Sequence, residues 1–290
     1  MNLTHTVDAM QAEAEQARCD GRRLALVPTM GALHDGHRAL VRRAKREADH
    51  VTVSIFVNPT QFAPDEDLDA YPRNLDGDLE TLDALGGVDA VFAPSVEDMY
   101  PLGAPTAWVE VEGLTDMLNG RYREGHFRGV TTVVTKLFNA CRPHVGVFGE
   151  KDAQQLVILR RMAEELCFGI EVVGVPTQRE ADGLACSSRN AYLTDEERAQ
   201  APVLSEAVAE ARALIAGATE EQPAEAVVRR TRNILDGAPL AEPQYVAVVD
   251  ARSLQPVETL RPGDDVLAAM AVFFGDTRLI DNAFVTAGSG

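Results

Sequence analysis

Five short apolar runs, rich in β-branched residues, alternate with segments of helical periodicity over the first 175 residues. The runs cover residues 24–27, 51–57, 88–92, 145–148 and 170–175. Continuous apolar runs of this length are typical of strands that are buried on both faces, as in parallel sheets. One helix is predicted before the first run, at about 5–19. Others are predicted between successive runs, at about 38–49, 79–85, 131–140 and 156–166. The alternation predicts an α/β fold with a Rossmann-like, doubly wound parallel sheet.

The pattern changes beyond residue 190. Thr194 and the acidic residues after it predict a helix N-terminus, and the helix is expected to run to about residue 216. A second helix is predicted over 224–235. Strand-like runs follow at 245–249, 266–274 and 277–285, the last two joined as a hairpin through Gly275 and Asp276. We therefore predict two domains, 1–176 with the parallel sheet and 177–290 as a smaller α+β domain, and we expect the second to act as a lid.

Composition and charge narrow the class of protein. The chain has 290 residues, of which 46% are hydrophobic and 25% are charged, as in ordinary soluble globular proteins. The net charge of −18 argues against a nucleic-acid partner, which would require clustered Lys and Arg. No apolar run is long enough to cross a membrane, and the four scattered cysteines fit a reducing compartment. We expect a cytoplasmic protein without a membrane or nucleic-acid partner.

The first strand leads into a glycine-containing turn with two histidines. Gly31 and Gly36 allow a tight turn and a close approach of the backbone to a ligand. His34 and His37 are three residues apart, so on a helix they share a face and can donate hydrogen bonds to phosphate oxygens near the positive helix end. A purely structural turn is the alternative. A zinc site is disfavoured, because no Cys or Glu pair stands nearby to complete the ligands.

Two further strand ends carry polar motifs. The run 145–148 leads into Gly149, Glu150, Lys151 and Asp152, where the lysine can place its charge on phosphate. A surface ion pair is the alternative interpretation of this turn. The run 51–57 ends in Asn58-Pro59-Thr60-Gln61, at the sheet edge where α/β proteins bind ligands. Gln61 is a candidate for contacting hydroxyl and carboxylate groups, although Asn-Pro alone indicates only a turn.

Three other segments carry candidate chemistry. Ser187, Ser188 and Arg189 follow the fifth run and are suited to a polyphosphate. Cys186 beside them is a weaker candidate nucleophile, since no histidine base is adjacent. The segment 121–128 holds three arginines and a histidine, which suit either an anion site or a surface loop. Asp78 lies in an acidic stretch that favours a solvated loop, but its carboxylate is also of the type that holds Mg²⁺.

Taken in order, these motifs resemble those of the pantothenate synthetase (pantoate–β-alanine ligase) family, a branch of the HIGH-motif nucleotidylyl transferases. The likeness lies in Pro28-Thr29-Met30-Gly31 with His34-Asp35-Gly36-His37, in the Asn58–Gln61 turn, and in two later motifs. These are Gly-Glu-Lys-Asp-Ala-Gln-Gln at 149–155 and Arg-Glu-Ala-Asp-Gly-Leu-Ala-Cys-Ser-Ser-Arg-Asn at 179–190. The chain departs from the family pattern at Glu124, where a proline is usual, at Ala153, where an aromatic residue is common, and at Cys186, where methionine is usual.

The resemblance implies a reaction and a set of roles. It implies ATP-dependent condensation of (R)-pantoate with β-alanine through a pantoyl adenylate, with Mg²⁺, in coenzyme A biosynthesis. It also implies a homodimer. His37 is the expected proton donor, and His34, Lys151, Ser187, Ser188 and Arg189 are expected to act on the phosphates. Gln61 and Gln155 are expected to bind pantoate, Gln61 also β-alanine, and Asp78 is the candidate Mg²⁺ ligand. The expected ATP-binding residues are Met30, Gly31, Ala32, Leu33, His34, Asp35, Gly36, His37, Gly149, Glu150, Lys151, Asp152, Gln178, Cys186, Ser187, Ser188 and Arg189.

Two alternative functions stay open. One is a different nucleotidylyl transferase, which would have no use for two ligand glutamines. The other is a non-catalytic nucleotide-binding regulatory protein, which loss of His34, His37, Lys151 or the Ser-Ser-Arg motif would have favoured; all of them are present.

Overall fold

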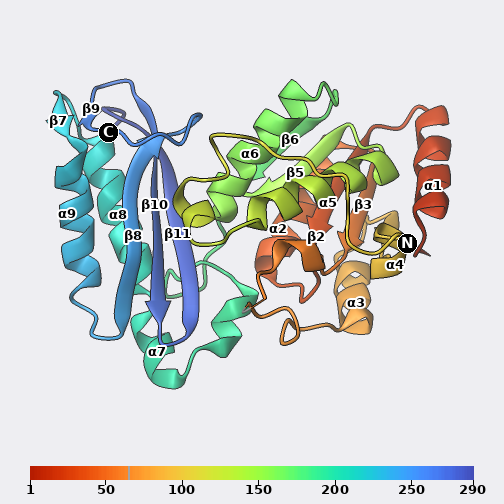
Figure 1. Cartoon of the computed structure of the whole chain (residues 1–290), viewed down its shortest axis with the longest axis horizontal. Coiled ribbons are helices and arrows are strands. Elements are labelled where there is room, and N and C mark those ends of the chain that lie inside the picture. Colours follow the sequence, from red (N-terminus) through yellow and green to blue (C-terminus); the bar gives the residue numbers. More distant parts are fainter. Residues whose placement is uncertain (65) are drawn as a thin grey trace. The chain divides into compact units, whose positions relative to one another are not determined.

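The computed structural model of the chain describes residues 1–64 and 66–290. These residues form two compact units, whose segments can be followed by colour in Figure 1. The first holds Met1–Thr115, Arg123–Glu150 and Ile158–Pro176, and the second holds Asp116–Tyr122, Lys151–Val157 and Thr177–Gly290. Two short stretches before residue 176 thus pack with the second unit, and the domain boundary near that residue stays a prediction.

Six parallel strands form the sheet of the first unit, in the order β1-β4-β3-β2-β5-β6. Figure 1 labels β2, β3, β5 and β6. The strands are β1 (Asn2–Thr4), β2 (Leu24–Thr29), β3 (His50–Ile55), β4 (Ala90–Phe92), β5 (Val145–Gly149) and β6 (Glu171–Val175). The chain winds outward from β2 to β3 and β4, and later continues on the other side of β2 with β5 and β6. This confirms the predicted doubly wound sheet, and it makes β2 and β5 neighbours at the point where the winding reverses.

The sixth strand, β1, was not predicted from the sequence. Its three residues pair with β4 at the edge of the sheet, and the first two of them are exposed. A strand so short and so little buried leaves no apolar run, which explains why the hydrophobic pattern did not reveal it.

Helices lie on both faces of this sheet (Figure 1). They are α1 (Val7–Cys19), α2 (Asp35–Glu47), α3 (Leu75–Leu85), α4 (Val96–Met99), α5 (His126–Cys141) and, in part, α6 (Ala153–Glu165). Leu40 and Val41 of α2 and Leu82 of α3 pack in one core with the β-branched residues of the strands. α1 contacts α5, and both contact β2. Within the described part of the chain, no helix is both long and apolar enough to span a bilayer.

The second unit contains a three-stranded antiparallel sheet in the order β11-β10-β8, covered by two helices. Its strands are β8 (Ala241–Asp250), β10 (Asp265–Phe274) and β11 (Thr277–Thr286), and its helices are α7 (Asp195–Gln200), α8 (Val203–Ala216) and α9 (Ala224–Leu235). β7 (Gln222–Pro223) and β9 (Thr259–Leu260) form a separate antiparallel pair. The hairpin predicted at Gly275 and Asp276 is confirmed by the pairing of β10 with β11.

The single helix predicted from Thr194 to about residue 216 is in fact two helices. Thr194 caps α7, as expected, through a hydrogen bond to the backbone N–H of Glu197. Pro202 then stands immediately before α8 as its N-cap. Proline has no backbone N–H, so Pro202 cannot donate the hydrogen bond that would continue α7, and the helix ends and restarts here although Ala201 keeps a helical conformation.

His50, the first residue of β3, generates a prediction about acid stability. Its side chain is buried, and neither ring nitrogen has a hydrogen-bond partner among residues 1–64 and 66–290. Burial lowers the pKa of His50 below 6.5, against the opposing charges of Asp89 and Glu13. The unfolded chain therefore binds a proton more readily than the folded chain, and stability falls as pH drops below the unfolded pKa of about 6.5.

We expect a His50→Leu variant to lose part of this pH dependence. The measurement is the free energy of unfolding in urea at several pH values between 7 and 5, for the variant and the unaltered protein. A shallower decline in the variant is the expected result. Equal declines would mean that His50 does not contribute to the loss of stability in acid.

Candidate active site

One buried carboxylate holds the turn after β2. Gly31 and Ala32 both have positive φ angles, 81° and 51°. The carboxylate of Asp78, in the first turn of α3, accepts hydrogen bonds from the backbone N–H of Ala32 (3.1 Å) and of Leu33 (2.8 Å). A Cβ atom on Gly31 would lie 2.8 Å from an oxygen of Asp78. The turn therefore requires glycine for its conformation and for the space that the carboxylate occupies.

The two histidines of this turn form a reciprocal cap at the start of α2. Nδ1 of His34 accepts a hydrogen bond from the N–H of Gly36 (3.1 Å), and Nδ1 of His37 accepts one from the N–H of His34 (3.3 Å). The ring centroids are 4.1 Å apart. Because Nδ1 is an acceptor in each ring, the neutral tautomer carries its proton on Nε2. The cap thus presets both imidazoles as Nε2–H donors at a helix N-terminus, as phosphate binding requires.

The turn after β3 places Gln61 beside the start of the histidine turn. Asn58 caps the short 3₁₀ turn Pro59–Gln61, and its amide donates to the side-chain oxygen of Gln61 (3.1 Å). The side-chain nitrogen of Gln61 donates to the sulfur of Met30 (3.1 Å). Asn58 is itself buried and accepts from the hydroxyl of Tyr100 (2.7 Å). Since β2 and β3 are paired parallel strands, the turns at their carboxyl ends are neighbours, which brings Met30 and Gln61 together.

The arginine-rich segment 121–128 forms hydrogen bonds, an ion pair and a cation–π contact with other residues of the chain. Arg123 forms a bidentate pair with Glu66 (2.6 and 2.7 Å). Burial alone would raise the pKa of Glu66, but hydrogen bonding and charge from Arg123 lower it below its ordinary value. Nδ1 of His126 lies 2.7 Å from the backbone oxygen of Gln61, and the guanidinium of Arg128 stacks on Trp108 at 4.3 Å. The contacts of Arg123 and His126 support the Gln61 turn, and the choice between an anion site and a surface loop for the segment stays open.

Helix α5 also packs unusually close to the Gln61 turn. The amide of Asn58 donates to the backbone oxygen of Gly129 (3.3 Å). A Cβ atom built on Gly129 would overlap the backbone of Thr60. Glycine at this position is therefore a condition for the observed place of Gln61.

The Gly149–Asp152 turn stands at the end of β5, the neighbour of β2. Gly149 and Glu150 belong to the first unit, and Lys151 and Asp152 to the second. The ammonium of Lys151 lies 3.8 Å from the carboxylate of Asp152, and only 20% of the Lys151 side chain is exposed. The amide of Asn282 on β11 donates to the backbone oxygen of Lys151 (2.7 Å). The main chain at Lys151 is therefore anchored to a strand.

The structure distinguishes the two glutamines that open α6. Gln154 is buried, and its side chain accepts from the N–H of Asn119 (2.9 Å) and donates to the backbone oxygen of Met117 (2.7 Å). Gln154 thus connects α6 to the segment Asp116–Tyr122. Gln155 is only half-buried, which is compatible with its predicted contact to a substrate.

The motif at 179–190 is a small hairpin followed by a short helical turn. The backbone N–H of Cys186 donates to the oxygen of Gln178 (2.9 Å), and Arg179 pairs with Ala185 in a β-bridge. Asn190 returns to the hairpin through hydrogen bonds to Glu180 (2.7 Å) and Ala185 (3.1 Å). Ser187, Ser188 and Arg189 follow the hairpin and are half-buried. The remaining motif residues thus build the support for these three.

The predicted site residues fall into two sets, one in each unit. The first unit holds Met30, Gly31, Ala32, Leu33, His34, Asp35, Gly36, His37, Gln61, Asp78, Gly149 and Glu150. The second unit holds Lys151, Asp152, Gln155, Gln178, Cys186, Ser187, Ser188 and Arg189. Contacts within each set are direct, such as those of Gln61 with Met30 and of His37 with His34.

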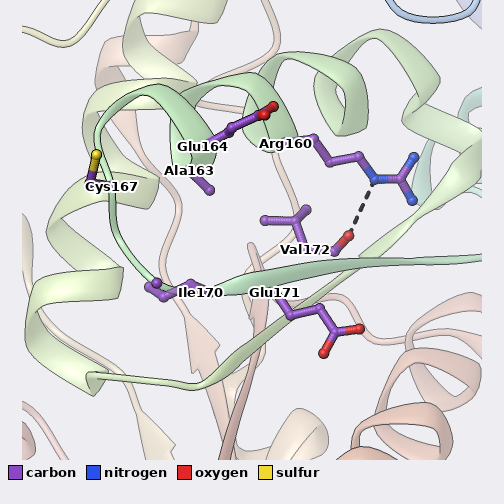
Figure 2. A pocket seen from close by; sticks show the side chains of 8 residues that line it. Arg160, Ala163, Glu164, Cys167, Ile170, Glu171 and Val172 are labelled. Carbon is purple, nitrogen blue, oxygen red and sulfur yellow. Dashed lines mark hydrogen bonds between the residues drawn. The ribbon is translucent and has the colours of Figure 1, made fainter.

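A surface hollow next to β6 lies apart from these residues in the sequence (Figure 2). It is lined by Arg160, Ala163, Glu164, Cys167, Gly169, Ile170, Glu171 and Val172. The side chain of Arg160 donates to the backbone oxygen of Val172 (3.2 Å). None of its lining residues is a predicted site residue.

The residues that hold the site residues in place were not predicted from the sequence. Asp78 was expected either in a solvated loop or as a metal ligand, and the loop expectation is wrong because Asp78 is buried in the first turn of α3. No role was given to Glu66, Asp281 or Asn282. The one sequence signal for Asp281 and Asn282 is that an acidic and an amide side chain stand next to each other in an otherwise largely apolar strand. The partner of such a residue is distant in sequence, as Arg179 is from Asp281, so the pattern alone did not reveal it.

Comparison with known proteins identifies the family. The family model for pantoate–β-alanine ligase matches residues 2–284. The chain is 66% identical to the pantothenate synthetase of Salinibacter ruber, over 98% of each chain, and 51% identical to that of Heliobacterium modesticaldum, over 98% of this chain and 99% of that one.

Solved structures of the same family share the fold. Pantothenate synthetase from Thermus thermophilus aligns with a TM-score of 0.89 at 43% identity, over 98% of this chain and 99% of that one. The ligase from Francisella tularensis, solved with a β,γ-ATP compound and β-alanine, aligns with a TM-score of 0.79 at 31% identity, over 98% and 97%. Because the motifs are present and the family model matches residues 2–284, this protein belongs to the pantoate–β-alanine ligase family.

Proposed function

We propose that the protein condenses pantoate with β-alanine at the expense of ATP, through a pantoyl adenylate, and releases AMP and pyrophosphate. The observation that carries the proposal is the position of Gln61 in the first unit. Its amide lies 3.1 Å from Met30, at the start of a turn whose two imidazoles are preset as donors. A group that can bind an organic acid thus stands directly beside a phosphate-binding helix end. The family membership supports the same substrates.

The first step joins the two substrates. An oxygen of the pantoate carboxylate attacks the α-phosphorus of ATP, the bond to the β-phosphate oxygen breaks, and pyrophosphate leaves. Negative charge grows on the phosphate oxygens, and the Nε2–H groups of His34 and His37 stabilise it by hydrogen bonds. His37 carries the proton-donor role in this assignment, as a hydrogen-bond donor to the developing charge. Lys151, Ser187, Ser188 and Arg189 are assigned to the phosphates from their motifs.

The second step uses the adenylate as an acyl donor. The neutral amine of β-alanine attacks the acyl carbon, a C–N bond forms, and AMP leaves with the electrons of the broken C–O bond. The proton that the nitrogen loses passes to the phosphate of the released AMP or to water. Gln61 and Gln155 are assigned to pantoate, and Gln61 also to β-alanine. Catalysis of this kind relies on positioning, so the anchoring of Gln61 by Asn58 and His126 contributes to it directly.

Magnesium is expected to bind together with ATP. No group of three or more His, Cys, Asp or Glu side chains suited to a metal occurs among the described residues. Each oxygen of Asp78 already accepts a backbone N–H. We propose that Asp78 mainly holds the histidine turn and that Mg²⁺ arrives with the ATP phosphates, since Mg²⁺ commonly relies on substrate phosphates and water for most of its ligands.

Location and assembly remain part of this proposal. A cytoplasmic enzyme is supported by Cys19, Cys141 and Cys167, which are free thiols. A homodimer is proposed on family resemblance alone.

The proposed first step predicts ATP–pyrophosphate exchange that requires pantoate and proceeds without β-alanine. We expect His34→Ala and His37→Ala each to slow the exchange by about 10²- to 10³-fold, the usual loss for one donor to a developing oxyanion. The exposed His5, which contacts the backbone oxygen of Ala93, supplies the control variant His5→Ala with unaltered exchange. No exchange, and no AMP after β-alanine is added, would overturn the enzyme proposal and favour a nucleotide-binding protein.

The structural role of Asp78 predicts a loss of stability that magnesium does not influence. In Asp78→Asn, an amide N–H replaces one acceptor oxygen opposite the backbone N–H groups of Ala32 and Leu33. We expect a loss of about 1–3 kcal/mol in the free energy of unfolding, measured in urea with EDTA present. Asp76→Asn, an exposed neighbour in the same helical turn, is the matched control. Unchanged stability together with a raised Mg²⁺ requirement for exchange would instead make Asp78 a metal ligand.

A further inference from the structure

Strand β11 carries two adjacent polar residues, Asp281 and Asn282, that are both buried, with exposed fractions of 1% and 8%. Successive residues of a strand point to opposite faces of the sheet. Asp281 therefore lies on the face of Leu279 and Ala283, which pack in one core with residues of α8. Asn282 lies on the other face. One strand can thus hold a different segment of the chain on each side.

On the helix-covered face, Asp281 anchors the hairpin that begins at Arg179. The guanidinium donates to both carboxylate oxygens, with distances of 2.6 and 3.0 Å, and also to the backbone oxygen of Gly183 (3.1 Å). The N–H of Asn282 donates to the same carboxylate (2.8 Å). The Asp281 side chain is fully buried, so the ion pair depends on both partners, since removing one leaves a buried charge uncompensated.

The position of Arg179 is passed on to residues 187–189 by the hairpin. Its two arms are joined at Gln178 and Cys186, directly before Ser187. Asn190, which follows these three residues in the sequence, donates hydrogen bonds to Ala185 and Glu180 of the hairpin. The Ser-Ser-Arg segment is thus held at both ends by a hairpin that Asp281 fixes to β11.

On the opposite face, Asn282 anchors the turn that carries Lys151. Its amide donates to the backbone oxygen of Lys151 at 2.7 Å. Arg278 lies on the same face and donates to the side-chain oxygen of Asn119 (2.6 Å), whose backbone N–H in turn donates to Gln154 (2.9 Å). β11 therefore holds the chain around the start of α6 at two points. One is the backbone of Lys151, and the other is Gln154, which is reached through Asn119.

We propose that Asp281 and Asn282 are positioning residues for adenylation. Neither contacts a substrate in this scheme; together they set Lys151 and the Ser187, Ser188 and Arg189 segment in a fixed relation, each tied to one of two consecutive residues of the same strand (Figure 1, β11). The inference rests on the proposed function, which assigns Lys151 and the Ser-Ser-Arg segment to the phosphates of ATP.

The test compares Asp281→Asn and Asn282→Ala with Thr286→Ala. Thr286 is an exposed residue of the same strand whose hydroxyl donates to Asp265 (2.6 Å), and it supports no site residue. The readouts are kcat/KM for ATP and KM for pantoate in pantoate-dependent ATP–pyrophosphate exchange, the Kd of ATP by calorimetry, and the thermal unfolding midpoint. We expect the first two variants to lose kcat/KM for ATP by on the order of tenfold to a hundredfold, as for a misplaced binding group. Asp281→Asn should leave the KM for pantoate near that of the unaltered protein, because the hairpin that Asp281 holds carries no residue assigned to pantoate. Thr286→Ala should behave like the unaltered protein.

A second pair of variants keeps the test decisive if Asp281→Asn does not fold. Arg179→Lys keeps the positive charge but loses the bidentate geometry, and should recover part of the activity that Arg179→Gln loses. Folded variants with normal kcat/KM for ATP would overturn the inference. An equal loss for ATP and pantoate that follows the unfolded fraction would also overturn it, because the role would then be structural only. Absence of exchange in the unaltered protein would instead reject the proposed function on which the inference depends.

Discussion

The histidine turn depends on the buried carboxylate of Asp78. Two consecutive residues with positive φ, Gly31 and Ala32, direct the backbone N–H groups of Ala32 and Leu33 away from any strand or helix partner. Asp78 satisfies both, from the first turn of α3. An unsatisfied buried N–H costs about 1–3 kcal/mol, so this carboxylate is a condition for the turn. This turn determines where α2 begins. It therefore also determines the reciprocal cap that fixes the tautomers of His34 and His37.

The same principle recurs in the second unit, where strand residues position loops at a distance. Asp281 holds the hairpin of Arg179, and Asn282 holds the backbone of Lys151. Gly129 and His126 act similarly on Gln61 in the first unit, one by leaving space and one by a hydrogen bond. In both units, the residues with the proposed chemistry lie in turns or in the first turn of a helix, and groups on α3, α5 and β11 help to fix them. Such support favours a site with preset geometry, which charge stabilisation in a phosphoryl-transfer step requires.

The parts of the fold that follow from local pattern were predictable from the sequence. Apolar runs identified β2 to β6, and the position of the Gln61 turn directly after its strand placed it at the edge of the sheet where ligands bind. The short edge strand β1 and the break at Pro202 were missed, because three part-exposed residues give no pattern and a single proline was overridden by the helical composition around it. The roles of Asp78, Asp281 and Gln154 could not be predicted, since each depends on a backbone or side-chain partner far away in the sequence.

Direct attack of a carboxylate on the α-phosphorus, which forms an acyl adenylate, is the central step of the proposed reaction. The most direct test follows the oxygen atoms. Pantoate labelled with ¹⁸O in its carboxylate is incubated with ATP, Mg²⁺, β-alanine and the protein, and the products are analysed by mass spectrometry. We predict one ¹⁸O atom in the phosphate of AMP for each molecule of pantothenate formed, since the carboxylate oxygen leaves with AMP. Label in inorganic phosphate, or AMP without label, would contradict this step.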